Sequence, residues 1–337
     1  MKNTKLIISS GLEAEDPEDR ADTGPDVELR HLVFGEAQHG LRLDQALVEL
    51  VPEFSRSYLQ QLIDLEGVSI NGKVVRKPSA RVRAADRGVI ELRPTPQSQA
   101  FKPEAMSLEI VYEDEHLFII NKPAGLVVHP APGNWSGTLL NGLLAYDIKA
   151  MNLPRAGIVH RLDKDTSGLM VVARTRPVMD ALIRLIAARE VSRQYVALAH
   201  RPWVGAATRE INAPMGRDPR NRLRMAVVDL EKNSGKLART DVNLLQNCDQ
   251  GCLVRCTLHT GRTHQIRVHM ASIGHSLVAD ELYGGAAAAG MHRQALHAFR
   301  LAFLHPVTQE SMVFQAPLAE DLTLALSQWG LSYNPKQ

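Results

Sequence analysis

Apolar residues recur in two kinds of pattern along the N-terminal part of the chain. Between residues 43 and 66 they follow three-to-four spacing on both sides of Pro52, which predicts two short helices. Residues 68–70 and 73–75 are short apolar runs around an Asn-Gly dipeptide, which supplies the positive φ values of a type I′ turn. These patterns predict a small helix-helix-hairpin module.

A linker and a second module follow. Pro94, Pro96 and Pro103, with polar residues among them, mark the linker. Beyond it we predict strands at 110–112, 117–120, 158–159, 169–173, 195–199 and 253–258, and helices at 139–145, at 178–189 and from an N-cap at Thr263. Strands and helices alternate without the regular βαβ spacing or G-x-G-x-x-G turn of a dinucleotide fold, so we expect the α+β class.

The first 30 residues differ in composition from the rest. They contain few apolar residues and eight acidic ones: Glu13, Glu15, Asp16, Glu18, Asp19, Asp22, Asp26 and Glu28. This composition predicts a disordered acidic extension over residues 1–30. Because the whole chain has a net charge of only +2, the remainder is basic, which suits a polyanionic partner.

The overall composition is that of an ordinary globular protein large enough for two domains, with 337 residues, 45% of them hydrophobic and 23% charged. Neither a signal-peptide core nor a membrane span is evident, so we expect a cytoplasmic protein without a membrane partner.

The chain has an odd number of cysteines, Cys248, Cys252 and Cys256, which predicts reduced thiols. They lack paired C-x-x-C spacing, so no metal site is expected.

The densest polar segment lies between two predicted strands. Residues 160–168 have the sequence His-Arg-Leu-Asp-Lys-Asp-Thr-Ser-Gly, which places Asp163 beside Arg161 on a loop. A carboxylate held between rigid strands is suited to nucleophilic or acid–base chemistry.

This segment resembles the signature of the RluA-type RNA pseudouridine synthases, His-Arg-Leu-Asp-x-x-Thr-Ser/Thr-Gly, at every position. Four further segments resemble the same family: 121–130, 193–195, 260–269 and 293–298. The resemblance implies the pseudouridine synthase fold over residues 105–332, with a mixed, largely antiparallel sheet and a central RNA-binding cleft. It also implies that a small α/β module over residues 41–100 is an S4 RNA-binding domain.

The same resemblance implies roles for individual residues. Asp163 is the catalytic residue, Arg267 pairs with it and keeps it ionised, and Tyr195 stacks on the uracil. The expected substrate-binding residues are Arg161, which fills the vacated base stack, and Lys122, His129, His160, Arg193, Arg262, His264 and Gln265. In the S4 domain, cations that can lie against phosphates are Arg56, Lys73, Arg76, Lys77 and Arg81.

Pseudouridine formation moves the bond at ribose C1′ from uracil N1 to C5. It needs no redox change, so no cofactor is expected. A carboxylate attacks either ribose C1′ or uracil C6, and a separate base removes the C5 proton; the sequence leaves the point of attack open. A paired target nucleotide must first leave its stack, at a cost of a few kcal/mol.

Other site types fit the residues less well. Asp163 begins a D-x-D-x-S-G run like that of a calcium loop, but Arg174 stands where a glutamate ligand is needed. The G-x-x-x-x-G-K match at 67–73 is followed by Val74 in place of the Ser/Thr of a phosphate-binding loop, and no H-E-x-x-H occurs. A glycoside hydrolase needs a second carboxylate across the substrate. A non-catalytic RNA-binding or ribosome-assembly protein is the alternative from another class.

Three segments distinguish branches of the family. Residues 127–130, 154–157 and 225–227 look most like the RluD branch, whose members modify uridines in the helix 69 stem-loop of 23S rRNA. The RluC branch also carries an S4 domain and acts at other 23S rRNA sites, and it is the alternative. The expected partner is 23S rRNA or a pre-50S ribosomal particle, bound by a monomer.

Overall fold

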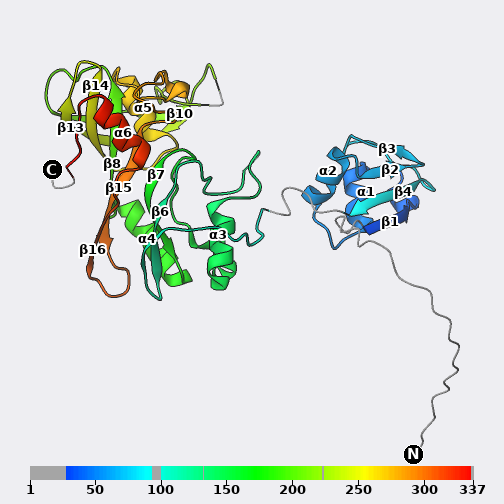
Figure 1. Ribbon diagram of the computed structural model, residues 1–337. Helices are drawn as coiled ribbons and strands as arrows, with labels where there is room; N and C mark the ends of the chain where they lie inside the picture. Colours follow the sequence, from blue (N-terminus) through cyan, green and yellow to red (C-terminus); the bar gives the residue numbers. More distant parts are fainter. Residues whose placement is uncertain (1–27, 93–99, 132, 222–223, 335–337) are drawn as a thin grey trace, which may run out of the picture. The chain divides into compact units, whose positions relative to one another are not determined.

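The computed structural model describes residues 28–92, 100–131, 133–221 and 224–334. They fall into two compact units, 28–92 and 100–334 (Figure 1). The predicted acidic extension lies outside the described residues up to position 27. Pro94 and Pro96 of the predicted linker also lie outside them.

The smaller unit packs two helices against a four-stranded antiparallel sheet with strand order β1-β4-β2-β3. Its elements are β1 (Glu28–Val33), η1 (Glu36–Gln38), α1 (Leu43–Leu50), α2 (Arg56–Asp64), β2 (Val68–Ile70), β3 (Lys73–Val74) and β4 (Arg87–Leu92). The predicted hairpin is confirmed, because Asn71 and Gly72 have φ values of 50° and 75°. Leu47 and Leu62 of the helices are fully buried against the core that includes Ile90.

Strand β1 enlarges this unit beyond the segment 41–100 predicted from the sequence. It pairs with β4 from Glu28, opposite Leu92, to Val33, opposite Arg87, so residues 28–30 are not part of an extension. Most of its side chains are exposed. A strand recruited by backbone pairing without a buried apolar face leaves little hydrophobic pattern in the sequence.

The larger unit is built on a nine-stranded sheet with the order β5-β6-β7-β15-β8-β14-β13-β9, to which β16 adds beside β15. All neighbours are antiparallel except β7 and β15, which are parallel. A mixed, largely antiparallel sheet in an α+β fold is thereby confirmed. The strands of this sheet are β5 (Ile110–Glu113), β6 (Leu117–Lys122), β7 (Ser167–Ala173), β8 (Ser192–His200), β9 (Thr208–Asn212), β13 (Arg239–Asn247), β14 (Gly251–Leu258), β15 (Leu296–Leu304) and β16 (Ser311–Gln315).

The remaining elements of this unit are helices and a small second sheet. The helices are α3 (Leu139–Tyr146), η2 (Ile148–Asn152), η3 (Pro154–Gly157), α4 (Arg176–Ala188), α5 (Gln265–Ser272), η4 (Glu281–Tyr283) and α6 (Glu320–Gln328). The small sheet contains β10 (Met215–Arg217), β11 (Met225–Val227) and β12 (Gly235–Lys236).

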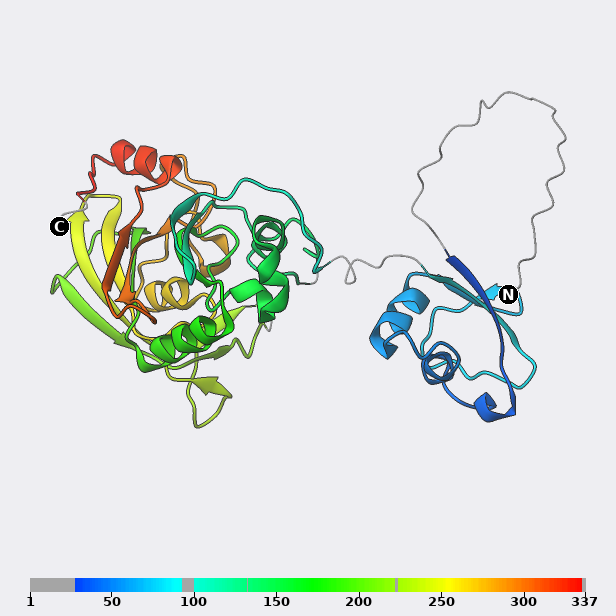
Figure 2. The ribbon, with the colours of Figure 1, turned by 90° about the horizontal axis from the view of Figure 1, so that it is seen from below.

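Helices cover both faces of the large sheet (Figures 1 and 2). Successive side chains of β6 point to opposite faces, as in any strand. Phe118 and Ile120 join the core that contains Leu143 of α3, whereas Ile119 joins the core that contains Leu182 of α4. The apolar runs of β6 and β7 follow from burial on both faces.

The predicted strand at residues 158–159 was wrong. Ile158 forms only an isolated bridge with Val172 of β7. Gly157 has a φ of 81°, and a Cβ atom there would lie 1.9 Å from the carbonyl oxygen of Ala173. The chain therefore crosses the end of β7 at close range and turns into the polar loop, because only glycine fits this approach.

Candidate active site

A cavity of about 730 Å³ lies in the larger unit. Its wall is formed by the polar loop before β7, by β8, by the turn before α5 and by the segment around His129. Every predicted catalytic or substrate-binding residue except Lys122 lines it: Asp163, Tyr195, Arg267, Arg161, His160, His129, Arg193, Arg262, His264 and Gln265. Segments far apart in the sequence thus meet at one site.

The loop that carries Asp163 is fixed at both ends. The amide of Thr166 donates to the carbonyl oxygen of Asp163 at 3.1 Å, and the amide of Val171 in β7 donates to Nε2 of His160 at 3.1 Å. Burial lowers the pKa of His160 to about 3, with the charge of Arg193 acting in the same direction. His160 is therefore a neutral acceptor at neutral pH, and its ring attaches the loop to the sheet.

Arg267 joins two carboxylates. Its Nη1 donates to Oδ2 of Asp163 at 3.1 Å, while Nε and Nη2 donate to Oδ2 and Oδ1 of Asp280, each at 2.8 Å. Burial opposes the charge of Arg267, but the hydrogen bonds and charge of Asp280 and the charge of Asp163 raise its pKa overall. The guanidinium fork is thus fixed by the buried Asp280 and presents one nitrogen to Asp163.

His264 and Tyr283 complete the surroundings of this pair. Nε2 of His264 lies 3.9 Å from Oδ1 of Asp163, and its Nδ1 lies 2.8 Å from the hydroxyl of Tyr283. The guanidinium of Arg267 lies 5.0 Å from the centre of the Tyr283 ring, a cation–π contact. Burial lowers the pKa of His264, so the imidazole tends to be neutral beside the carboxylate.

Helix α5 begins differently from the prediction. Its N-cap is His264, with a φ of 58°, rather than Thr263, and no side chain caps it. The side-chain oxygen of Gln265 accepts from the amide of Arg262 at 3.0 Å and from the hydroxyl of Thr260 at 2.7 Å. The amide nitrogen of Gln265 donates to the carbonyl of Arg239 and to Thr240. Gln265 is thus occupied in holding the turn, so we assign it a positioning role.

Tyr195 and Arg193 occupy alternate positions of β8 and therefore point to the same face of the sheet, toward the cavity. Burial raises the pKa of Tyr195 to about 12, so its side chain is a neutral phenol at neutral pH. It offers an aromatic face in the cavity.

Arg161 and His129 line another part of the cavity wall. Arg161 is exposed and has no hydrogen-bond partner among the described residues. Burial lowers the pKa of His129 to about 4, assisted by the charges of Arg155 and Arg161. Arg161 is thus an exposed cation on this side of the cavity, next to a neutral imidazole.

Lys122 does not reach the cavity, contrary to its predicted role in substrate binding. Its side chain is fully buried, and Nζ donates to the carbonyl oxygens of Pro123, Leu126 and Lys164 at 2.8–2.9 Å. Burial lowers its pKa to about 7, against the attraction of Asp165. Its hydrogen bonds connect the end of β6 to the loop that carries Asp163, so Lys122 positions this loop without lining the cavity.

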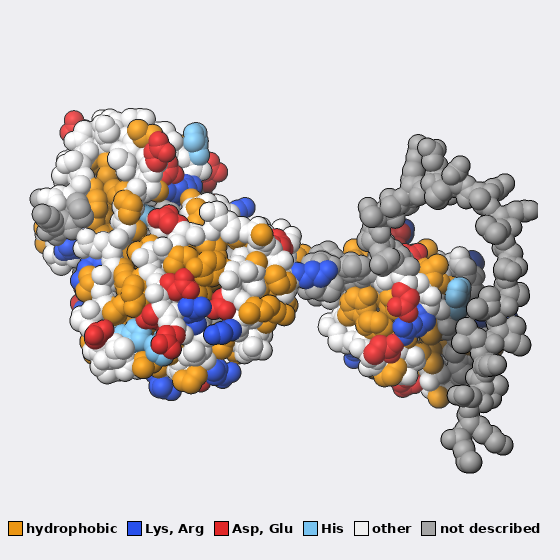
Figure 3. Space-filling model, turned by 60° about the horizontal axis from the view of Figure 1, so that its bottom comes forward, with side chains coloured by type: hydrophobic (Ala, Val, Ile, Leu, Met, Phe, Trp, Pro, Cys, Tyr) orange, Lys and Arg blue, Asp and Glu red, His pale blue; other side chains and the backbone are white. Residues whose placement is uncertain are grey.

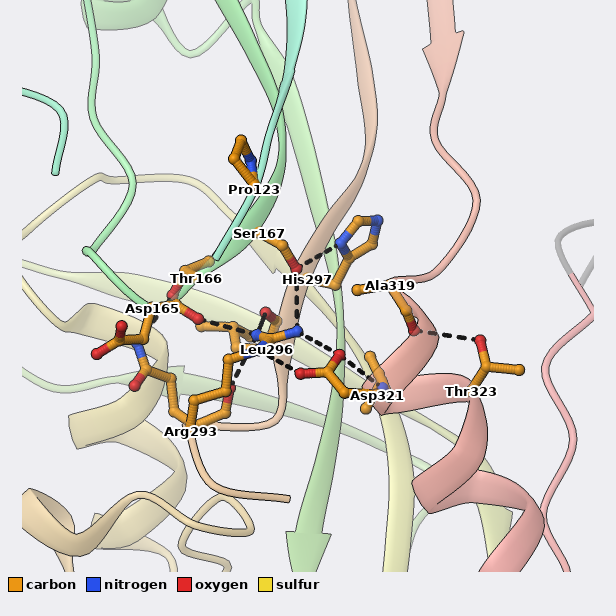
Figure 4. Close-up of polar contacts among 12 residues, drawn as sticks. Pro123, Asp165, Thr166, Ser167, Arg293, Leu296, His297, Ala319, Asp321 and Thr323 are labelled. Atoms are coloured by element: carbon orange, nitrogen blue, oxygen red, sulfur yellow. Dashed lines mark hydrogen bonds and ion pairs between the residues drawn. The ribbon is translucent and has the colours of Figure 1, made fainter. Parts of the chain in front are cut away.

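A second arginine supports the same loop from the C-terminal side (Figure 4). Arg293 forms two hydrogen bonds with Asp321 of α6, at 2.6 and 2.8 Å, and its Nη1 donates to the carbonyl of Asp165 at 2.9 Å. Ser167 lies 3.3 Å from Nη2 of Arg293 and 2.9 Å from Nδ1 of His297. Helix α6 is thereby connected through one guanidinium to the loop of Asp163.

Asp280, Tyr283 and the Arg293–Asp321 pair were not predicted from the sequence as parts of the site. Asp280 and Tyr283 lie in a short Asp-Glu-Leu-Tyr-Gly turn, where an acid and a phenol three residues apart are the only sequence signal. Arg293 begins a segment that the resemblance had singled out, but nothing in the sequence pairs it with α6.

The predicted cations of the smaller unit differ in their surroundings. Arg56 pairs with the buried Asp44 at 2.8 Å, Arg76 pairs with Glu66 at 2.9 Å, and Arg81 donates to the carbonyl of Gly40. By contrast, Lys73 and Lys77 are exposed and have no side-chain partner among the described residues. The two lysines are therefore the cations of the five that have neither a carboxylate nor a backbone carbonyl as side-chain partner among the described residues.

Among the residues that the structure describes, no group of three or more histidine, cysteine, aspartate or glutamate side chains could hold a metal ion. Cys248, Cys252 and Cys256 are free thiols. No helix in the described part of the chain is long and apolar enough to cross a membrane.

Two families match the sequence: RNA pseudouridylate synthase over residues 116–272 and the S4 domain over residues 41–87. A protein of Neisseria meningitidis serogroup B named ribosomal large subunit pseudouridine synthase D is 46% identical over 301 residues, which cover 86% of this chain and 78% of that protein. The protein of the same name from Escherichia coli K12 is 42% identical over 300 residues, covering 85% and 90% of the two chains.

Solved structures share the fold. The human protein RNA pseudouridylate synthase domain containing 1 is 26% identical, with a TM-score of 0.52 over 66% of this chain and 90% of that one. Human RNA pseudouridylate synthase domain containing 4 has a TM-score of 0.53 at 22% identity, over 67% of this chain and 94% of that one.

Proposed function

Because the chain belongs to the RNA pseudouridylate synthase family and is an isomerase of that class, we propose that its substrate is large-subunit ribosomal RNA. The proposal is supported by the relatives that are 42% and 46% identical over most of the chain, which are named for that substrate. The observation that carries the chemistry is Asp163, held at 3.1 Å by Arg267 on the wall of a cavity.

Asp163 is the nucleophile in this proposal. Arg267 donates to Oδ2 of Asp163 and orients the carboxylate on the cavity wall for attack. In one route Oδ of Asp163 bonds to ribose C1′ while the N1–C1′ electron pair leaves with the uracil. C5 of the rotated ring then displaces the carboxylate from C1′, the C5 proton goes to a base, and N1 takes up a proton. Substrate and product are isomers, so no cofactor is expected.

The other residues of the cavity hold the extruded nucleotide. The phenol ring of Tyr195 stacks on the uracil, and its raised pKa keeps it uncharged there. Arg161, exposed and without a partner among the described residues, fills the space that the base leaves in the RNA stack. His129, His264 and Arg262 line the remaining wall and contact the ribose-phosphate.

The smaller unit docks the RNA through its S4 domain, which we place at residues 41–100, with the catalytic domain at 105–332. Arg56, Lys73, Arg76, Lys77 and Arg81 contribute positive charge for phosphates. On the face of the larger unit shown in Figure 3, acidic and basic side chains are intermixed. In the larger unit, the arginines that line the cavity supply the positive charge for a polyanion.

We further propose uridines of the helix 69 stem-loop of 23S rRNA as targets, modified in the cytoplasm by a monomer that acts on free RNA or on a pre-50S particle. The support is the likeness of residues 127–130, 154–157 and 225–227 to the RluD branch. A set of other 23S rRNA sites, as in the RluC branch, is the alternative.

Isomerisation displaces the hydrogen at uracil C5, so tritium release from RNA labelled at that position tests the reaction. The wild-type protein is expected to release tritium in the presence of a chelator and without an added cofactor. Asp163→Asn is expected to release none and still bind the RNA, while the neighbouring Asp165→Asn remains active. An active Asp163→Asn variant rules out the nucleophile, and RNA binding without release by the wild type favours a non-catalytic RNA-binding protein.

A further inference from the structure

Arg193 is a buried cation without a counter-charge. Arg193 is only 6% exposed. Its Nε atom is buried and has no hydrogen-bond partner in the described part of the chain. No carboxylate among the described residues forms an ion pair with it. A buried charge that nothing compensates is unfavourable for folding, so its retention points to a ligand.

Arg193 lines the cavity from a nearly buried position. It shares a face of β8 with Tyr195, and a Cβ atom at Gly261 would lie 2.8 Å from its Nη1. The backbone of Gly261 therefore covers it without adding a side chain, and Tyr195, which is 5% exposed, lies beside it. Arg161, by contrast, is exposed.

This depth decides which part of a nucleotide Arg193 meets. When a nucleotide is extruded into an enzyme pocket, the base enters the pocket and the phosphates remain with the strand outside. An arginine beside the stacking residue is therefore opposite the edge of the base. On that edge uracil carries two acceptors, O2 and O4, on either side of the N3–H donor, and a guanidinium, which only donates, can bind either oxygen.

We propose that Arg193 is a further catalytic residue that donates a hydrogen bond to a carbonyl oxygen of the target uracil, O2 or O4, and stabilises the negative charge that the ring gains during isomerisation. This inference rests on the proposed function of the cavity. It separates two arginines of the site by role: Arg267 holds the nucleophile, and Arg193 holds the departing base.

The charge arises by either route of attack. If Asp163 attacks C1′, the electron pair of the broken C1′–N1 bond stays on the uracil and is shared among N1, O2 and O4. If Asp163 attacks C6, the pair of the C5–C6 double bond moves onto O4. In both cases a fixed, nearly buried cation stabilises the charged ring more than the neutral uridine, and this lowers the barrier.

The test compares Arg193→Met, which removes the charge and keeps most of the volume, with Arg193→Lys, which keeps the charge. We expect Arg193→Met to lower the single-turnover rate at saturating enzyme by about 100- to 1,000-fold and Arg193→Lys to recover part of it. The affinity for RNA, and its dependence on salt, should stay close to wild type. If Arg193 instead bound a phosphate, its replacement by Met would reduce the slope of log RNA affinity against log salt by about one. That reduction, together with an unchanged rate, would overturn the proposal.

Thermal unfolding of the free protein gives a second readout. Because Arg193→Met removes a buried charge that has no partner, the melting temperature should be equal to or higher than that of the wild type. A slower enzyme that is no less stable separates catalysis from folding. If Arg193→Met melts well below the wild type and Arg193→Lys has no better rate than Arg193→Met, Arg193 is structural and the proposal fails.

Thio-substituted uridine at the target position locates the contact. Sulfur at position 2 or 4 is a weaker hydrogen-bond acceptor than oxygen, so one of these RNAs should react more slowly with the wild type. Arg193→Met should not discriminate between that RNA and the oxygen-containing one. Equal discrimination by wild type and variant excludes the contact. A wild-type protein that isomerises no uridine refutes the proposed function itself, whereas normal activity in Arg193→Met refutes only this inference.

Discussion

Asp280 and Arg267 are joined by two hydrogen bonds of 2.8 Å in a place where Asp280 is almost completely buried. The pair leaves a single nitrogen of Arg267 for Asp163, at 3.1 Å. The orientation of the Asp163 carboxylate therefore depends on an aspartate that does not itself line the cavity.

Replacing Asp280 with Asn should impair both stability and catalysis. The free energy of unfolding should fall by roughly 3–5 kcal/mol, because a buried guanidinium loses its partner. In molecules that remain folded, kcat should fall about 10- to 100-fold with a smaller change in KM, because Arg267 is free to rotate away from Asp163. Urea unfolding and steady-state kinetics measure the two effects.

Asp180→Asn is the matched control, since Asp180 pairs with Arg176 on the surface at 3.1 Å. It should leave both quantities unchanged. Wild-type stability and kcat in Asp280→Asn would falsify the positioning role of Asp280.

Helix α6 should influence catalysis through Asp321. Asp321→Asn weakens its hold on Arg293, which also donates to the carbonyl of Asp165 and lies within reach of Ser167 (Figure 4). We expect kcat to fall several-fold with RNA affinity retained, because the Asp163 loop loses one of its supports. Glu320→Gln, at an exposed neighbouring position of α6, should behave as wild type. Equal kcat values for the two variants would show that α6 does not influence catalysis through Asp321.

The stability of the larger unit should depend on pH through its buried histidines. Burial lowers the pKa of His160 to about 3 and the pKa values of His129 and His297 to about 4, from a usual value of 6.5. The unfolded chain binds protons at these positions below pH 6.5, whereas the folded protein does not bind them until about pH 4. The free energy of unfolding therefore falls as the pH decreases through this interval, by about 1.4 kcal/mol per pH unit for each histidine.

His160→Gln removes one of these contributions and keeps an oxygen that can accept from the amide of Val171. Between pH 4.5 and 6 its free energy of unfolding should decrease less steeply than that of the wild type, by about 1.4 kcal/mol per pH unit. His292→Gln, at an exposed position, should leave the slope unchanged. A His160→Gln slope equal to that of the wild type contradicts the neutral assignment of His160.

Lys73 and Lys77 should dominate the electrostatic part of RNA docking by the smaller unit. Both are exposed without a side-chain partner among the described residues. The double change to Gln should weaken RNA binding and reduce the slope of log affinity against log salt by about two, one for each phosphate contact. Lys232→Gln removes a lysine that pairs with Asp229 at 3.4 Å in the larger unit and should have little effect. An unchanged slope in the double variant would place RNA docking elsewhere.

Local patterns explain which parts of the fold could be predicted. The helices of the smaller unit and its Asn-Gly hairpin are encoded by neighbouring residues, and the structure confirms them. Strand β1 could not be predicted in this way, because its side chains are largely exposed and its partner β4 lies more than 50 residues later. The start of α5 shows the same limit: Thr263 was expected to cap the helix, but the side chain of Gln265 binds the polar groups of the turn before it.

In the candidate site, too, contacts between neighbouring residues could be predicted and contacts between distant residues could not. Asp163, Arg161 and His160 stand together in one polar segment, so their proximity is visible in the sequence. Asp280 reaches Arg267 only because the turn after α5 folds back, and Lys122 is withdrawn from the cavity by three carbonyl oxygens. Charge alone does not distinguish a lysine that binds backbone from one that binds RNA.

The most direct test of the central claim is a map of pseudouridines across large-subunit rRNA from cells that lack this protein, complemented with the wild-type chain or with Asp163→Asn. The account predicts that a defined set of sites disappears, that the wild type restores it and that Asp163→Asn does not, although it is present at the same level. Restoration by Asp163→Asn, or a map that is unchanged when the protein is absent, would contradict it.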